Sequence, residues 1–219
     1  MKIIFEDKDI LVCEKPQGVP CETAAPGRKC AADVLRDENG VTCPLYTVHR
    51  LDTNTGGVLV LAKNKKSAAF LSAQIAAGEF KKRYLAVLDG VPAEPCGEYR
   101  DLLFKDSRKN RSFVVDRMRK GVKEASLEYE TLGVSEEYGK SLVKVLLHTG
   151  RTHQIRVQFS SRRMPLCGDG KYGSRDNNAQ LSLWACSLSY TDEKGRLREF
   201  ASLPDTGVYP WSLFSEDIK

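Results

Sequence analysis

The sequence contains no C-x-x-C motif, although it has seven cysteines. An odd number of cysteines without metal-binding spacing argues against a disulfide framework and against a structural zinc site. Free thiols in a reducing compartment are the simple interpretation. The cysteines stand at positions 13, 21, 30, 43, 96, 167 and 186.

Long apolar segments are also missing. No apolar run approaches the roughly 18 residues that a membrane-spanning helix needs. The N-terminus becomes acidic at Glu6 and Asp7, which is too early for a secretory signal peptide. These two observations predict a cytoplasmic protein.

Several catalytic motifs are absent as well. The three histidines, His49, His148 and His153, form no H-x-x-x-H or H-E-x-x-H pattern, so we expect no catalytic metal. The sequence has no G-x-S-x-G, P-loop or G-x-G-x-x-G motif, which argues against an esterase, a nucleotide hydrolase and a Rossmann enzyme. We expect no cofactor. A chain of this kind suits an enzyme that uses a carboxylate directly as nucleophile or base.

The composition is that of an ordinary soluble protein of 219 residues, with 41% hydrophobic and 29% charged residues. Apolar periodicity predicts a helix over 65–77, capped by Asn64. The order of the predicted strands favours antiparallel neighbours over βαβ units, so we expect one α+β domain over 1–219 with a large, mainly antiparallel or mixed sheet. The main strands are expected at 58–62, 81–90, 97–104, 111–116, 124–132 and 141–148.

Residues 49–57 read HRLDTNTGG and run into the apolar segment 58–62. An apolar run of this length indicates a buried strand, and a polar turn before it can present a side chain from a rigid base. Asp52 is the candidate reactive group. The alternative is a turn-forming aspartate whose carboxylate bonds its own backbone.

A second candidate region is residues 149–156, TGRTHQIR. A glycine-led turn that opens a helix offers unpaired N–H groups, and Arg151 and Arg156 add guanidinium groups suited to a carboxylate or phosphate. Thr152 is expected to cap this helix. The alternative is an ordinary capped helix with solvated arginines.

Basic residues are concentrated in the window 105–123, where eight lysines and arginines accompany two aspartates. This window carries a net charge of +6 in a chain whose net charge is +5. A loop or ribbon that meets a polyanion such as a nucleic-acid backbone would have this character. A merely solvated face is the alternative.

The sequence is identified as resembling the RluA-type pseudouridine synthases, on motifs that follow one another in the family's order. The signature H-R-L-D-x-x-T-x-G lies at 49–57, before the apolar strand and Ala62-Lys63. Further matching stretches cover nearly the whole chain: KP-x-G at 15–18, K-x-Y-x-A-x-x-x-G at 82–90, GRTHQIRV at 150–157 and P-x-x-GD-x-x-YG at 165–173.

The resemblance implies a catalytic domain without an S4 domain, which isomerises a uridine in ribosomal or transfer RNA to pseudouridine with neither metal nor cofactor. Asp52 would be the essential carboxylate, with Tyr84 and Arg156 as the other catalytic residues. We expect Arg156 to pair with Asp52 and keep it ionised, and Tyr84 to offer a flat face to the flipped uracil. A monomer is expected.

RNA contacts are predicted for seven further residues: His49, Arg50, Arg151, His153, Arg117, Arg119 and Lys120. The sequence departs from the family pattern at Gly56-Gly57, where Ser-Gly is common. That departure is the one hint of a rival function, a non-catalytic RNA-binding or ribosome-assembly protein on the same fold.

Overall fold

The computed structural model describes residues 1–23 and 27–219. The chain forms two compact units. The first unit contains Met1–Lys82 and Trp184–Pro204, and the second contains Arg83–Leu183 and Asp205–Lys219. The chain therefore passes from one unit to the other inside a strand, Lys81–Asp89. A division into two compact units does not decide whether they form one domain, so the single domain over 1–219 stays a prediction.

The first unit is built around the fully buried strand β4 (Gly56–Ala62). It pairs antiparallel with β2 and β3 and parallel with β10. Strand β1 pairs antiparallel with β2, and β11 pairs antiparallel with β10. Because β4 is covered on both faces, all its residues are apolar or glycine. The other strands are β1 (Lys2–Glu6), β2 (Ile10–Lys15), β3 (Tyr46–Thr47), β10 (Leu183–Thr191) and β11 (Leu197–Ala201).

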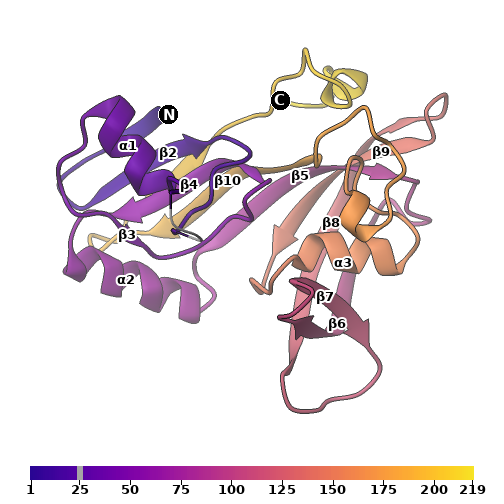
Figure 1. Cartoon of the computed structure of the whole chain (residues 1–219), viewed down its shortest axis with the longest axis horizontal. Helices are drawn as coiled ribbons and strands as arrows, with labels where there is room; N and C mark the ends of the chain where they lie inside the picture. The colour runs from indigo at the N-terminus through magenta and orange to yellow at the C-terminus, as the bar shows by residue number, and fades with distance from the viewer. Residues whose placement is uncertain (24–26) are drawn as a thin grey trace. The chain divides into compact units, whose positions relative to one another are not determined.

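Two helices, α1 (Ala31–Asn39) and α2 (Lys65–Ala76), lie on opposite faces of these strands (Figure 1). Helix α2 inserts Leu71 into a core formed with alternate residues of β4, Val58 and Val60. The Asn64 side chain accepts a hydrogen bond from the Ser67 N–H at 2.9 Å, which confirms the predicted cap. The sequence pattern was sufficient here because cap and apolar stripe are both local.

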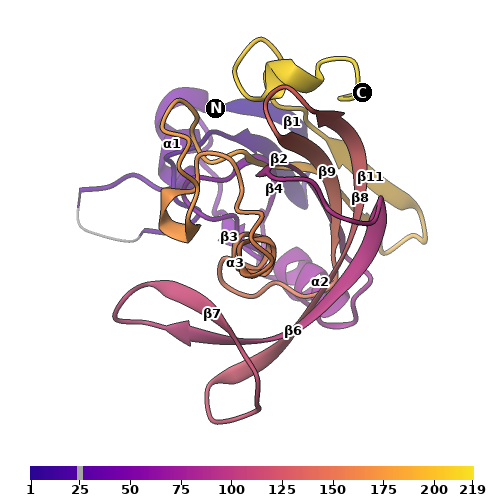
Figure 2. The ribbon, with the colours of Figure 1, turned by 90° about the vertical axis from the view of Figure 1, so that its right-hand side faces the viewer.

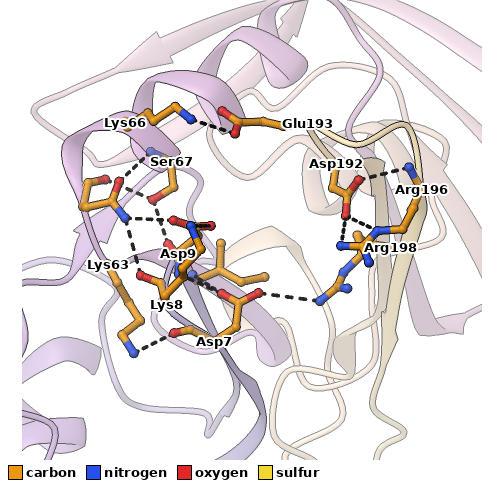
Figure 3. A network of polar contacts seen from close by, with 12 residues as sticks. Asp7, Lys8, Asp9, Lys63, Lys66, Ser67, Asp192, Glu193, Arg196 and Arg198 are labelled. Carbon is orange, nitrogen blue, oxygen red and sulfur yellow. Dashed lines mark hydrogen bonds and ion pairs between the residues drawn. The ribbon is translucent and has the colours of Figure 1, made fainter.

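A network of exposed polar contacts holds the start of α2 against the β1–β2 turn (Figure 3). The Ser67 hydroxyl donates to the Asp9 carbonyl at 2.7 Å, and Lys63 pairs with Glu6 at 2.7 Å. Across the network, Lys66 pairs with Glu193 in the β10–β11 turn at 2.8 Å. Exposed ion pairs contribute little each, so this network orients the turns more than it stabilises the unit.

The second unit is a sheet in the order β5-β9-β8-β6-β7, in which the β9–β8, β8–β6 and β6–β7 pairs are antiparallel. Helix α3 (Gln154–Ser161) packs on it through Val157, which joins Leu103, Ala125 and Tyr172 in a small core. Figure 2 shows β6 and β7 as a long hairpin beyond α3. The strands are β5 (Lys81–Asp89), β6 (Cys96–Asp106), β7 (Arg111–Val115), β8 (Val122–Ser135) and β9 (Lys140–Leu147).

Two single-turn 3₁₀ helices, η1 (Gly170–Tyr172) and η2 (Trp211–Phe214), complete the second unit. The predicted α+β class with a large, mainly antiparallel or mixed sheet is confirmed. Strands β4 and β10 form a parallel pair within it. The predicted cap of α3 is wrong. His153, in the left-handed region at φ 53°, precedes the helix, and the Gln154 side chain instead accepts from the Arg151 N–H and the Thr149 hydroxyl. No helix in the described residues is long and apolar enough to cross a membrane.

Candidate active site

Asp52 lies in the first unit, half-buried, in the turn that leads into β4. The Thr55 N–H donates to the Asp52 carbonyl at 3.0 Å, so residues 52–55 form a closed turn at the mouth of the strand. The next residues are buried members of β4. A side chain held in this way loses little entropy on meeting a ligand, because the backbone beneath it is already fixed.

The segment 15–21 clamps the Asp52 turn from outside. The ammonium of Lys15, which is fully buried, donates to the carbonyls of Thr53 at 3.1 Å, Val19 at 2.7 Å and Pro16 at 3.0 Å. The Thr53 carbonyl also accepts from the Gly18 N–H at 2.8 Å. The segment that follows Lys15 and the Asp52 turn are therefore joined by one point charge.

Contacts on either side complete the clamp. The Cys21 thiol accepts from the Leu51 N–H at 3.2 Å and donates to the Leu51 carbonyl at 3.4 Å. On the other side of Asp52, the Gln17 side-chain amide donates to the Asn54 carbonyl at 2.7 Å. The residues flanking Asp52 are thus fixed by side chains that lie 30 and 37 positions earlier in the chain.

Electrostatics link Lys15 to Asp52. Burial lowers the pKa of Lys15 to about 8, while the nearby Cys21 thiol and Asp52 carboxylate raise it in part. A buried ammonium without a hydrogen-bonded carboxylate loses hydration that its three carbonyl contacts restore only partly. Lys15 therefore places a positive charge under the Asp52 turn at neutral pH. The sequence motif KP-x-G contained this lysine, but the pattern did not reveal its role.

The Gly56-Gly57 departure has a local cause in the first unit. Gly56 faces Trp184 across the parallel β4–β10 pair, and a Cβ at position 56 would stand 2.3 Å from the indole ring. Gly57 has φ +112°, and its Cβ would stand 2.2 Å from the Ala185 carbonyl oxygen. Both positions therefore exclude a side chain. The departure accompanies a tryptophan on the neighbouring strand and leaves the Asp52 turn closed.

His49 and Arg50 point to different environments. His49 is buried; its Nε2 accepts from the Val60 N–H at 3.1 Å, and burial lowers its pKa to about 3. A buried, neutral ring that accepts a hydrogen bond from the backbone of β4 fits a role in holding this strand better than a contact to RNA. Arg50 is mostly exposed and lies 3.5 Å from the Glu22 carboxylate. RNA contacts by both residues stay predictions.

The second unit contains Tyr84 and Arg156. Tyr84 lies in β5 and is 6% exposed. Arg156 is held in a two-point contact by Asp169, from Nε to Oδ2 at 2.6 Å and from Nη2 to Oδ1 at 2.7 Å. Both partners are buried. A guanidinium and a carboxylate in this parallel arrangement form the strongest of the common ion pairs.

Asp169 was not singled out by sequence reasoning, although the motif at 165–173 contains it. Its carbonyl accepts from the N–H groups of Tyr172 and Ser174, so it closes a tight turn. The Tyr172 ring centroid lies 5.0 Å from the Arg156 guanidinium carbon, and its hydroxyl lies 2.9 Å from His153 Nδ1. The turn thus supplies both the carboxylate and the aromatic face that orient Arg156.

The basic candidates of the second unit are mostly exposed. Arg117, Arg119 and Lys120 lie in the segment between β7 and β8, with the Arg119 guanidinium over the Phe104 ring at 5.3 Å. Arg151 is half-buried, and its Nε donates to the Glu124 carbonyl at 2.9 Å. These placements are compatible with contact to a ligand, and their RNA-binding role stays a prediction.

Asp52 therefore belongs to one unit, and Tyr84 and Arg156 belong to the other. Within the second unit the partner of Arg156 is Asp169, a pairing that the sequence analysis did not foresee. The predicted Asp52–Arg156 ion pair would join the two units, and it stays a prediction. A carboxylate on a fixed turn and a buried, oriented guanidinium are each suited to act on a charged or polar substrate.

One cluster with metal-ligand chemistry occurs in the described part of the chain: Asp89, Cys167 and Asp176. The Lys140 ammonium lies 2.5 Å from Asp89 and 3.0 Å from Asp176, and it supplies the positive charge that these carboxylates need. Although burial opposes it, hydrogen bonds to both carboxylates raise the pKa of Lys140. The cluster is thus accounted for as a buried ion pair.

Comparison with known proteins supports the motif resemblance. A sequence model of the family RNA pseudouridylate synthase matches residues 9–161. An uncharacterized RNA pseudouridine synthase of Aquifex aeolicus is 36% identical over 192 residues, which cover 84% of this chain and 59% of that protein. Ribosomal large subunit pseudouridine synthase D of Borreliella burgdorferi is 31% identical over 220 residues, covering 91% of this chain and 64% of that protein.

A solved human structure, RNA pseudouridylate synthase domain containing 4, has the same fold, with a TM-score of 0.79 at 24% identity. The match covers 100% of this chain and 94% of the human one. This chain spans less than two thirds of the length of the two bacterial relatives. Since the family model matches residues 9–161, more than half of the sequence, the chain belongs to the RNA pseudouridylate synthase family.

Proposed function

We propose that this protein converts uridine in RNA to pseudouridine. In this isomerisation the bond from N1 of uracil to C1′ of the ribose breaks, the base turns over, and C5 bonds to C1′. The proton leaves C5 and N1 gains one, so the reaction needs no net reactant besides the RNA. The observation that carries the proposal is the Asp52 turn, clamped by Lys15 and Cys21 in a chain of this family.

Asp52 is the proposed essential carboxylate. The Asp52 carboxylate lies close enough to the Lys15 ammonium for the two charges to interact. An ionised carboxylate is the form that acts as a nucleophile or as a base. Three roles are open to such a carboxylate: attack on C1′, attack on the base, or removal of the C2′ proton.

Tyr84 and Arg156 are the proposed partners of Asp52 in the second unit. A uridine in a stem must leave its stack, at a cost of a few kcal/mol, and an aromatic face returns roughly 1–3 kcal/mol per stacked base. We propose that Tyr84 provides that face. Arg156, preset by Asp169, would pair with Asp52 or with the turning base.

The proposed substrate is ribosomal or transfer RNA. The name of the Borreliella relative refers to the large ribosomal subunit, which favours ribosomal RNA as the first target to examine. We propose Arg117, Arg119 and Lys120 as part of the RNA-binding surface. Neutralising all three is expected to weaken RNA binding and to flatten its salt dependence. If the slope of log K against log salt does not change, these three side chains do not contact the RNA.

The decisive experiment compares the wild-type protein with Asp52→Asn and Asp52→Ala. Each purified protein is incubated with RNA from cells that lack the enzyme, and pseudouridines are mapped along the RNA. We expect new pseudouridine at one or a few positions with the wild type and none with either variant, while RNA binding persists in both. Normal turnover by Asp52→Ala would overturn the proposal.

A non-catalytic RNA-binding protein is the alternative function. Its one sequence hint was Gly56-Gly57, and the packing of Trp184 and Ala185 against these glycines accounts for that departure without any change in the turn. If RNA binding is measured but no pseudouridine appears at any position, this alternative takes the place of the isomerase.

A further inference from the structure

Arg111 is a half-buried arginine at the start of β7 that the proposed reaction does not use. Its guanidinium carbon lies 4.9 Å from the centroid of the Tyr172 ring and 5.5 Å from that of Phe113. Its Nε is excluded from solvent and has no hydrogen-bond acceptor. The two aromatic faces offset only part of the cost of removing this charge from water.

Arg111 differs in this respect from other arginines of the second unit. Arg156 is paired with Asp169, Arg162 with Asp101 at 3.0 Å, and Arg100 with Glu98 at 2.8 Å. In the described part of the chain no carboxylate pairs with Arg111.

The carboxylate nearest in register does something else. Asp106 stands opposite Arg111 in the β6–β7 pair, but its Oδ1 accepts from the N–H groups of Arg108 and Lys109 at 2.9 and 3.1 Å. Asp106 therefore closes the hairpin turn, and Arg111 remains a guanidinium without an anionic partner.

The position of Arg111 is fixed by its neighbour. The Ser112 hydroxyl donates to the Thr152 carbonyl at 2.6 Å, and the Ser112 N–H donates to the Tyr172 hydroxyl at 2.9 Å. Figure 1 shows β7 directly beside α3, where these bonds form. The hairpin is thus attached to Thr152, just before α3, and to Tyr172, whose ring the Arg111 guanidinium contacts.

Charge is unbalanced at this point of the unit. The guanidinium groups of Arg111 and Arg156 lie at similar distances, 4.9 and 5.0 Å, from the centroid of one ring, that of Tyr172. Asp169 neutralises Arg156 alone. One positive charge, partly removed from solvent, is therefore left without a carboxylate at the ring that Arg156 also contacts.

We propose that Arg111 binds a backbone phosphate of the RNA close to the nucleotide on which the enzyme acts. A planar fork of N–H donors matches two oxygens of a phosphodiester, and a preset guanidinium loses little entropy in binding it. The proposal rests on the proposed function, because it takes RNA as the ligand. It adds a phosphate contact on β7 that locates the RNA backbone relative to α3.

The test measures binding of a fluorescent oligouridine by anisotropy over a series of KCl concentrations. All proteins carry Asp52→Asn, so that the probe is not altered by turnover. Arg111→Gln is compared with Arg100→Gln, a matched control that removes the same charge from an exposed arginine of the same sheet. Arg111→Lys keeps the charge but not the fork, and thermal melting checks that each variant is folded.

Loss of one phosphate contact from a single strand lowers the slope of log K against log salt by about 0.7. We expect this change in Arg111→Gln, with an affinity about fivefold weaker. Arg100→Gln should keep the wild-type slope. Arg111→Lys should keep the slope and lose about twofold to threefold in affinity, because an ammonium cannot contact two oxygens at once in the same plane.

Equal slopes and affinities for Arg111→Gln and Arg100→Gln would overturn the phosphate site. If Arg111→Gln is unfolded, Arg111→Lys decides, and wild-type affinity in a folded Arg111→Lys protein would have the same meaning. A reduced salt slope for Arg111→Gln, together with no pseudouridine formation by the wild-type protein in the Asp52 experiment, would reject the isomerase and keep the phosphate site. Pseudouridine formation with an unchanged slope would reject only the phosphate site.

Discussion

Lys15 in the first unit and Arg156 in the second are buried cations that organise their surroundings in different ways. Lys15 is fully buried and contacts three backbone carbonyls but no hydrogen-bonded carboxylate. Arg156 is 8% exposed and binds one carboxylate, that of Asp169, at two points. Lys15 therefore fixes backbone around itself, whereas Arg156 is fixed by its partner.

The difference follows from the shapes of the two charges. An ammonium is compact and can collect acceptors from several directions, so it suits a place where two chain segments meet. A guanidinium is flat and directional, so it suits a single carboxylate in its plane. Substitutions at Lys15 should accordingly disturb the Asp52 turn, and substitutions at Asp169 should disturb the guanidinium.

The largest effect is expected for Asp169→Ala. It leaves the Arg156 charge buried without its carboxylate, and breaking a buried ion pair in this way costs about 3–5 kcal/mol. We expect a lower free energy of unfolding by that amount in urea denaturation, and a loss of pseudouridine formation.

Asp169→Asn is the matched control, since it keeps one acceptor oxygen but not the charge. Its unfolding free energy should fall by less than that of Asp169→Ala. If both variants are as stable as the wild type, the Arg156 contact is a surface-like pair and the contrast with Lys15 disappears.

A smaller effect is expected for Lys15→Met. Methionine fills a similar volume but leaves three carbonyls without their donor, while it also removes a costly buried charge. We expect a net loss of about 2 kcal/mol in the free energy of unfolding. The rate of pseudouridine formation should fall by more than the loss of folded protein explains, since the Asp52 turn loses both its clamp and its nearby cation.

The pH dependence of stability provides a second readout for Lys15. Its pKa is about 8 in the folded chain and 10.5 when unperturbed. Between these values the unfolded state binds the proton more tightly, so the free energy of unfolding rises with pH across this window. Subtracting the profile of Lys15→Met from that of the wild type should isolate this rise. A flat difference between pH 8 and 10.5 would show that folding does not lower the pKa of Lys15.

The smallest effect is expected for Gly56→Ser, which restores the residue common in the family. Its Cβ meets the Trp184 ring, and overpacking of this kind costs about 1–2 kcal/mol. Adding Trp184→Leu should recover part of the loss in thermal stability. A stabilised Gly56→Ser single variant would mean that the indole moves aside readily and that the glycine has another cause.

Much of the fold was readable from local pattern. The helix predicted over 65–77 with its Asn64 cap is found at 65–76, and the strand predicted over 58–62 is found at 56–62. Periodicity and capping chemistry were sufficient here because they act within one or two turns of chain. Thr152 was expected to cap α3, but the residue before the helix is the left-handed His153, which makes no side-chain cap hydrogen bond, and the Gln154 side chain binds the Arg151 N–H just before the helix. Capping residues that are close rivals cannot be ranked from their order alone.

The sequence by itself determined the family and the candidate Asp52, because residue types at fixed spacings carry that information. It did not determine partners. That Lys15 reaches Thr53, 38 positions later, that Arg156 pairs with Asp169, and that Arg111 is left without a carboxylate are results of packing. Ion pairs and hydrogen bonds need atoms within about 3–4 Å, and which groups come that close is decided only when distant segments of chain meet.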